Sequence, residues 1–293
     1  MSSTHSHTRD VTTSQPGKLS GRKCLITGGT SGIGLSIAEQ FLREGASTIV
    51  LVGRSKERLE AAAKTLRSST DSDALSGSEI ERTAYSDRVA LLVGDVGEAG
   101  SWMRELEKEM ANVDILVNAA GISIPNILPR SELADISQIL RTNLEGAVLT
   151  SRAFMRAAIR NRVRNRTNAE SPSKPRSKCI INVSSLLALK AGTGAVPYAA
   201  SKAGLLGLTR SLAVEASASL KDVIIRSNAI VPGYIETPMI ADFTPGEVGR
   251  LKDLIPLHRF GEPREIADAA VFLASNEYAN NCVLNLDGGL SAV

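Results

Sequence analysis

The sequence predicts an α/β protein, a single domain with a doubly wound, parallel, seven-stranded sheet and helices on both faces. From Lys23 onward, short apolar runs rich in β-branched residues alternate with longer segments whose apolar residues recur every three or four positions. This alternation is typical of parallel strands joined by helical crossovers. The 293 residues, 43% of them hydrophobic, suffice for a large core, and no internal repeat or linker divides them.

The individual elements follow from the same pattern. The expected strands occupy residues 23–27, 47–53, 89–94, 114–120, 179–184, 223–231 and 283–286. Helices are expected at 34–45, 55–68, 101–110 and 132–162, in the segment that begins at Tyr198, and at 263–275. Right-handed crossovers close such a chain into a sheet whose ligands bind beyond the carboxyl ends of the strands.

Three stretches fall outside this alternation. Residues 1–20 are rich in Ser and Thr and lack the apolar segment of a secretion signal, so they are expected to form a disordered tail before a domain at 21–293. A mitochondrial transit peptide remains an alternative for this tail. Residues 68–88 and 161–178 are expected to be loop insertions. The second is strongly basic; it is either a solvated face or an anchor for an acidic partner.

Composition excludes several classes of function. The 34 basic residues nearly balance the 31 acidic ones, and a net charge of +3 gives no reason to expect a nucleic-acid partner. No apolar run is long enough to span a membrane. Cys24, Cys179 and Cys282 share no spacing and lie in apolar contexts, which predicts buried free thiols and no metal site. A reducing compartment is expected, either the cytoplasm or the mitochondrial matrix.

A glycine-rich turn follows the first expected strand and opens a helix. Glycines let the backbone approach a pyrophosphate, whose charge is favoured at a helix N-terminus. A turn with a purely structural role is the alternative. The residues expected to contact a dinucleotide here are Gly28, Thr30, Ser31, Gly32, Ile33 and Gly34.

The second strand is followed by Arg54 and Ser55, where an acid would hold the ribose 2′-hydroxyl of NAD. A guanidinium at this position suits a 2′-phosphate, so the cofactor is predicted to be NADP(H). The alternative is a solvated arginine at the start of a helix.

The third and fourth strands also end in candidate cofactor residues. Asp95 and Val96 follow the third strand, and Asp95 is placed to accept from the adenine amino group. Asn118, Ala119 and Gly121 end the fourth, where small residues allow close approach. Turn chemistry alone is the alternative for both.

Tyr198 and Lys202 lie four residues apart in an Ala- and Leu-rich helical segment and therefore share one face. A neighbouring cation is expected to lower the pKa of the phenol, which could then exchange a proton with an oxygen that changes between carbonyl and alcohol. Ser185 ends the fifth strand and could hold the same oxygen. A chance Tyr-x-x-x-Lys pair is the alternative.

Together these motifs resemble the short-chain dehydrogenase/reductase family over residues 21–289, and the fold implied is Rossmann-type. The resemblance implies a catalytic tetrad of Asn143, Ser185, Tyr198 and Lys202. Tyr198 is the implied proton donor, and Lys202 the implied ribose ligand. Asn143 is the implied member of a water-mediated proton relay. The segment implied to receive the nicotinamide contains Pro232, Gly233, Ile235 and Thr237.

Within the family, residues 227–239, 259–275 and 284–289 most resemble the 3-oxoacyl-[acyl-carrier-protein] reductases. The resemblance implies NADPH-dependent reduction of 3-oxoacyl thioesters in fatty-acid synthesis, with acyl carrier protein as a partner and a homotetramer or dimer as the assembly. Reduction of free ketones, quinones, sugars or steroids is one alternative. A nucleotide-binding scaffold without catalysis is another. Asn280, Asn281 and Cys282 stand where the family usually has Thr-Gly-Gln, in a turn that asparagine can still form.

Overall fold

The computed structural model describes residues 17–72, 88–98, 100, 102–166, 176–219 and 223–293. Most of the predicted tail at 1–20 and parts of both predicted loop insertions lie outside the described residues. The assignment of these segments as tail and loops therefore stays a prediction.

The fold class is confirmed: seven parallel strands form one sheet in the order β3-β2-β1-β4-β5-β6-β7. The strand order reverses between β1 and β4, which in doubly wound sheets marks the place where ligands bind. The strands are β1 (Lys23–Thr27), β2 (Thr48–Gly53), β3 (Val89–Val93), β4 (Ile115–Asn118), β5 (Lys178–Val183), β6 (Ile225–Pro232) and β7 (Val283–Leu286).

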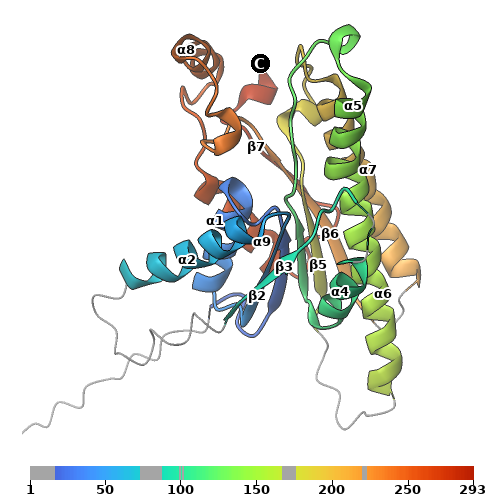
Figure 1. Ribbon diagram of the computed structural model, residues 1–293. Coiled ribbons are helices and arrows are strands. Elements are labelled where there is room, and N and C mark those ends of the chain that lie inside the picture. The colour runs from blue at the N-terminus through green and yellow to red at the C-terminus, as the bar shows by residue number, and fades with distance from the viewer. Residues whose placement is uncertain (1–16, 73–87, 99, 101, 167–175, 220–222) are drawn as a thin grey trace, which may run out of the picture.

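Helices cover both faces of the sheet (Figure 1). One face packs against α1 (Gly32–Arg43), α2 (Lys56–Ser72) and α9 (Pro263–Ser275). The other packs against α4 (Trp102–Glu109), α6 (Gly146–Arg166) and α7 (Val196–Ser219). The central strands are consequently buried on both sides, whereas the edge strands β3 and β7 are partly exposed.

The three cysteines are free thiols as predicted, but only two of them are buried. Cys24 and Cys179 are buried in β1 and β5, and Cys282 is half-buried just before β7. Burial raises the pKa of both buried thiols. These two cysteines therefore behave as small apolar core residues.

Some elements differ from those expected. The single helix predicted over 132–162 comprises α5 (Leu133–Leu140), a π-helical turn (Arg141–Glu145) and α6. Two helices extend into the predicted loops, because α2 continues to Ser72 and α6 to Arg166. The helix α8 (Pro245–Leu254) was not predicted, although Thr244 and Glu247 form the capping box that signals a helix start.

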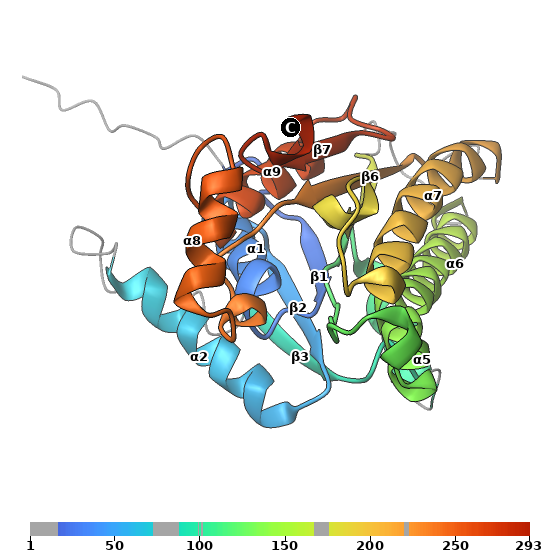
Figure 2. The same cartoon turned by 90° about the horizontal axis from the view of Figure 1, so that it is seen from above.

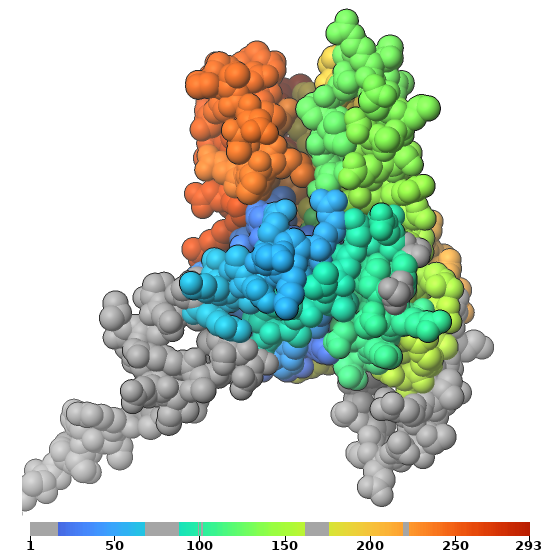
Figure 3. All heavy atoms as spheres, viewed as in Figure 1, coloured from blue at the N-terminus to red at the C-terminus, as the bar shows by residue number. Residues whose placement is uncertain are grey.

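The carboxyl ends of the strands open into a cleft. Seen from above, α8 and α5 stand on opposite sides of the sheet edge (Figure 2). The space-filling view shows the surface hollowed between these two regions (Figure 3). A small apolar cluster that includes Leu186, Leu251, Phe260 and Leu290 joins the turn after β5 to α8 and the last turn of the chain. Within the described residues, no helix is both long and apolar enough to span a membrane.

Candidate active site

The glycine loop between β1 and α1 is packed backbone against backbone. Gly28 has a φ of +68°, and a Cβ on it would lie 2.7 Å from the Cα of Ala120. A Cβ on Gly34 would lie 2.4 Å from the carbonyl oxygen of Gly28. Ile33 packs on the core, and the first turn of α1 contains no acidic residue. The loop thus fits an anion such as a pyrophosphate at the N-terminus of α1.

The residues expected around the adenosine meet at the ends of β2 and β3. Arg54 Nη1 lies 3.8 Å from Asp95 Oδ2, and Asp95 Oδ1 accepts from the backbone N–H of Gly97. Ser55 Oγ accepts from the backbone N–H of Arg58 and donates to Glu57, so this hydroxyl organises the start of α2. Val96, in the loop after β3, is buried against Gly146 at the start of α6. The side chains of Arg54 and Asp95 both remain partly exposed.

The Asn118 side chain is directed into the protein. Its Nδ2 donates to Asn182 Oδ1 at 2.9 Å and to Ser151 Oγ at 3.2 Å. Its Oδ1 accepts from Thr150 Oγ1 at 2.7 Å. This buried network holds the end of β4 in place, so Asn118 and Ala119 can face a cofactor only through the backbone.

Tyr198, Ser185 and Lys202 form one cluster where β5 and α7 meet, with Tyr198 and Lys202 buried and Ser185 half-buried. Ser185 lies close enough to the Tyr198 hydroxyl to favour its ionised form, and its Oγ accepts from the backbone N–H of Leu187 at 3.2 Å. The Lys202 Nζ lies 5.7 Å from the centroid of the Tyr198 ring and donates to the carbonyl of Val183 at 2.9 Å. The structure therefore unites the three residues that the sequence placed on a strand and a helix.

The pKa of Tyr198 departs from the sequence-based expectation. Burial raises it, and the nearby Ser185 side chain opposes that effect. The expectation that Lys202 lowers the pKa of Tyr198 is wrong for this geometry, because the ammonium faces the Val183 carbonyl. Burial lowers the pKa of Lys202 itself to about 8. A buried phenol with a raised pKa holds its proton at neutral pH.

Asn143 reaches the same region through the π-helical turn. Its Oδ1 accepts from the N–H of Ile122 at 2.8 Å, and its Nδ2 donates to the Ile122 carbonyl and to Ser201 Oγ. A Cβ on Gly121 would lie 3.1 Å from Lys202 Nζ and 3.5 Å from Asn143 Oδ1. Asn143 and Lys202 thus converge on Gly121.

The segment after β6 faces the glycine loop. The carbonyl of Tyr234 and the N–H of Glu236 form hydrogen bonds with the backbone of Gly261. The N–H and carbonyl of Ile235, which lies between them, therefore point away from Gly261. A Cβ on Gly32 would lie 3.2 Å from Thr237, so loop and segment nearly touch. Pro232 ends β6, and Gly233 bonds to β7.

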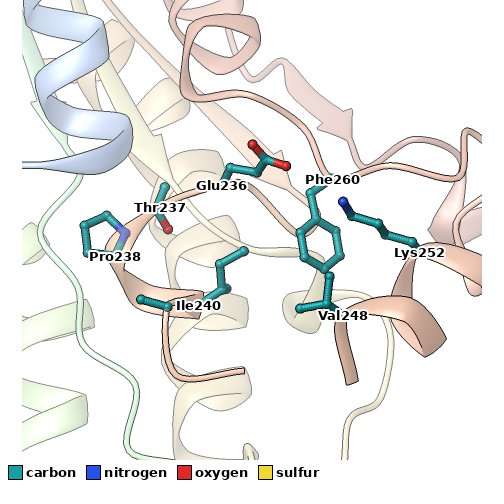
Figure 4. A pocket seen from close by; sticks show the side chains of 8 residues that line it. Glu236, Thr237, Pro238, Ile240, Val248, Lys252 and Phe260 are labelled. Atoms are coloured by element: carbon teal, nitrogen blue, oxygen red, sulfur yellow. The ribbon is translucent and has the colours of Figure 1, made fainter. Parts of the chain in front are cut away.

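A hollow of about 470 Å³ lies beside this segment (Figure 4). Its lining includes Thr237, Pro238, Ile240, Val248 and Phe260. The residues that line it do not include the tetrad. The hollow therefore lies between the Thr237 segment and α8.

Two side chains near the site were not identified from the sequence. Ser201 connects Asn143 to the backbone of Tyr198, since its Oγ accepts from Asn143 and donates to the Tyr198 carbonyl at 2.6 Å. Arg58 Nη2 lies 3.4 Å from Ser31 Oγ in the glycine loop. Ser201 directly precedes Lys202, but nothing in the spacing from Arg58 to Ser31 signals their contact, because it depends on the packing of α2 beside α1.

The doubly wound sheet, glycine loop and Ser-Tyr-Lys cluster define a dinucleotide-dependent oxidoreductase. The family model for short chain dehydrogenase matches residues 22–247. The chain belongs to this family, the short-chain dehydrogenases/reductases, and is an NAD(P)-dependent oxidoreductase acting on CH–OH and C=O groups.

Curated relatives match almost the whole chain. It is 34% identical to the human 3-oxoacyl-[acyl-carrier-protein] reductase over 270 residues, covering 92% of this chain and 98% of the relative. It is 33% identical to the Aquifex aeolicus enzyme of the same name over 275 residues, covering 93% and 98%.

The solved structures include enzymes named for a different substrate. Gluconate 5-dehydrogenase from Burkholderia cenocepacia, in complex with NADP and tartrate, superposes with a TM-score of 0.75 at 29% identity. The match covers 94% of this chain and 97% of that one. The fold and the family are thus common to proteins that act on different carbonyl compounds.

Proposed function

We propose that this protein is an NADPH-dependent reductase of 3-oxoacyl thioesters carried on acyl carrier protein, with a role in fatty-acid synthesis. The cofactor is NADP(H): a dinucleotide fits the glycine loop, Arg54 provides a cation after β2, and NADP is bound in the related gluconate 5-dehydrogenase. The substrate class is supported by the relatives named for this activity and by the chemistry of the site's rim.

The apolar rim carries the substrate assignment. Large apolar side chains are exposed in the segments on both sides of the Tyr198 cluster. They are Ile127, Leu128, Leu189, Val196 and Met239. A hydrogen bond from Asn126 N–H to the Gly194 carbonyl holds two of these segments together. Such a rim suits an acyl chain.

The tetrad residues have distinct proposed roles. Bound NADPH supplies the hydride to the carbonyl carbon. The neutral Tyr198 hydroxyl donates a proton to the developing alkoxide, and Ser185 holds that oxygen by a hydrogen bond. Lys202 presents a buried ammonium for the ribose, and Asn143 fixes the backbone at Ile122 and links to Ser201 for proton relay.

The remaining cofactor contacts are proposed at the carboxyl edge of the sheet. They involve the glycine loop (Gly28, Thr30, Ser31, Gly32, Ile33, Gly34), the adenosine side (Arg54, Ser55, Asp95, Val96), the β4 turn (Asn118, Ala119, Gly121) and the segment after β6 (Pro232, Gly233, Ile235, Thr237). Ile235 is proposed to bind the carboxamide through its outward backbone groups.

A substrate comparison tests this proposal. The rate of NADPH oxidation is measured with an acetoacetyl thioester, 5-ketogluconate, an apolar ketone and a quinone. The thioester should give the highest kcat/KM, because its apolar acyl group and thioester arm match the rim. A higher kcat/KM for 5-ketogluconate would favour the sugar-acid reductase that the structural relatives suggest. NADPH binding with no turnover of any of these compounds would favour the scaffold alternative.

A further inference from the structure

A second arginine approaches the glycine loop from α2. Arg58 Nη2 lies 3.4 Å from the Oγ of Ser31. Ser31 is the N-cap of α1, with extended backbone angles, but its side chain makes no capping hydrogen bond. Its hydroxyl instead faces Arg58 at the start of α2. A guanidinium and a hydroxyl lie together at the rim of the pyrophosphate loop.

Arg54 is directed elsewhere. Its Nη1 is paired with Asp95 Oδ2 at 3.8 Å, and Asp95 follows β3, the edge strand beyond β2. Arg54 therefore extends along the sheet edge toward the expected adenine position. The sequence-based prediction assigned the 2′-phosphate to Arg54 alone, yet Arg58 is the arginine that faces the loop.

Hydrogen bonds at the start of α2 fix the backbone from which the Arg58 side chain extends. The N–H of Arg58 donates to Ser55 Oγ at 3.1 Å, and Ser55 donates to Glu57 at 2.7 Å. These bonds fix the first turn of the helix, whose free N–H groups add positive potential. The 2′ position of the ribose should lie between a pyrophosphate at α1 and an adenine at Asp95. That position is next to Arg58 and Ser31.

We propose that Arg58, with Ser31, binds the 2′-phosphate of NADP(H) and determines the preference over NAD(H), while Arg54 acts mainly on the adenine side with Asp95. This assignment concerns the cofactor and does not depend on which carbonyl compound is reduced. It divides between two arginines a role that the sequence attributes to one.

Two nucleotides that differ only in the 2′-phosphate test the assignment. Calorimetric titration measures binding of 2′,5′-ADP and 5′-AMP to the protein and to Arg58→Gln. Glutamine removes the charge and keeps an amide near Ser31. We expect Arg58→Gln to weaken the binding of 2′,5′-ADP by about tenfold or more, since a charge-assisted hydrogen bond to the phosphate is lost. Binding of 5′-AMP should change by less than about twofold.

Lys56→Gln is the matched control. Lys56 is also a cation in the first turn of α2, but its side chain is exposed and pairs with Glu60. Lys56→Gln should leave the affinities for 2′,5′-ADP and 5′-AMP unchanged. Arg58→Lys should recover part of the 2′,5′-ADP affinity that Arg58→Gln loses. Thermal unfolding of each variant checks that the fold is intact. Unchanged 2′,5′-ADP affinity in Arg58→Gln, or equal loss for both nucleotides in a folded variant, would overturn the proposal.

Discussion

Tyr198 shows how burial rather than a neighbouring charge determines the state of a side chain. The phenol is surrounded by protein, so its ionised form loses solvation and its pKa rises. The nearby Ser185 side chain offsets part of this rise. The result favours a neutral hydroxyl at neutral pH, which is the state required for proton donation.

Tyr198→Phe is expected to lower kcat by about 10²- to 10⁴-fold, the usual contribution of a general acid. NADPH binding should be retained, because the phenyl ring keeps the packing of α7 against the turn after β5. Steady-state kinetics and fluorescence titration with NADPH measure the two effects. A variant with more than about a tenth of the original rate would contradict the proton-donor role.

Lys202 should make stability depend on pH. Its pKa in the folded protein is about 8, below the ordinary 10.5, so burial disfavours the charged form. Between these two values the unfolded chain binds more protons, and stability therefore rises with pH. Relative to Lys202→Met, the free energy of unfolding should increase by about 2 kcal/mol from pH 8 to pH 10.

Urea unfolding at both pH values measures this difference. The comparison with Lys202→Met removes the contribution of other titrating groups, provided that both proteins unfold in two states. Parallel pH dependences of the two proteins would show that Lys202 is charged to the same extent in the folded and unfolded states.

At the scale of elements, Arg226 ties the end of α9 to the sheet. This β6 side chain is fully buried and donates to the carbonyls of Leu273, Ala274 and Ala279. Its Nε also donates to Ser177 Oγ. The last carbonyls of a helix lack partners within the helix, and here one guanidinium supplies them.

Arg226→Met should lower the free energy of unfolding by about 3 kcal/mol, because several buried carbonyls lose their donor at once. The exposed Arg264→Met in the first turn of α9 is the control and should change stability by less than about 0.5 kcal/mol. Chemical denaturation of both variants measures the contrast. Equal, small decreases in the free energy of unfolding for both variants would show that water replaces the guanidinium without loss of stability.

The π-helical turn is an element that serves the site. Its extra residue between α5 and α6 brings Asn143 inward, to the backbone of Ile122. A regular helix over 132–162, as the periodicity predicts, would present a different face at this position. The apolar repeat identifies the helical segment but not the inserted residue.

At the scale of the whole molecule, the outer helices carry exposed apolar side chains. Figure 2 shows α6 and α7 side by side on one flank of the protein. Val148, Ile159 and Val214 on these helices are exposed, and Val214 is 67% exposed. Exposed apolar side chains grouped on one flank are typical of subunit contacts. We propose that this flank forms contacts in a homotetramer.

Val214→Glu should break the assembly into smaller species, because it places a charge in the apolar contact. Sedimentation velocity of the purified protein measures the change. Leu254→Glu on α8, an apolar position of comparable exposure at 51%, should leave the assembly intact. A monomeric parent protein, or a Val214→Glu variant of unchanged mass, would contradict the proposed contact.

Much of the fold follows from local pattern. The seven strands were predicted within a few residues because β-branched runs and their alternation with helices are encoded locally. The helix α8 was missed because Pro245 and Gly246 resemble a loop, although the capping residues Thr244 and Glu247 were present. Periodicity reports which face is apolar, and it is least informative for short elements outside the sheet.

The sequence by itself determined the order of the elements, the glycine loop after β1 and the presence of a Ser, a Tyr and a Lys suited to carbonyl chemistry. Their meeting could be anticipated because parallel strands bring their carboxyl ends to one edge. Only the tertiary structure decided that burial raises the pKa of Tyr198, that Asn118 points inward and that Arg58 reaches Ser31. Desolvation and long-range contacts depend on how whole elements pack, which spacing along the chain does not specify.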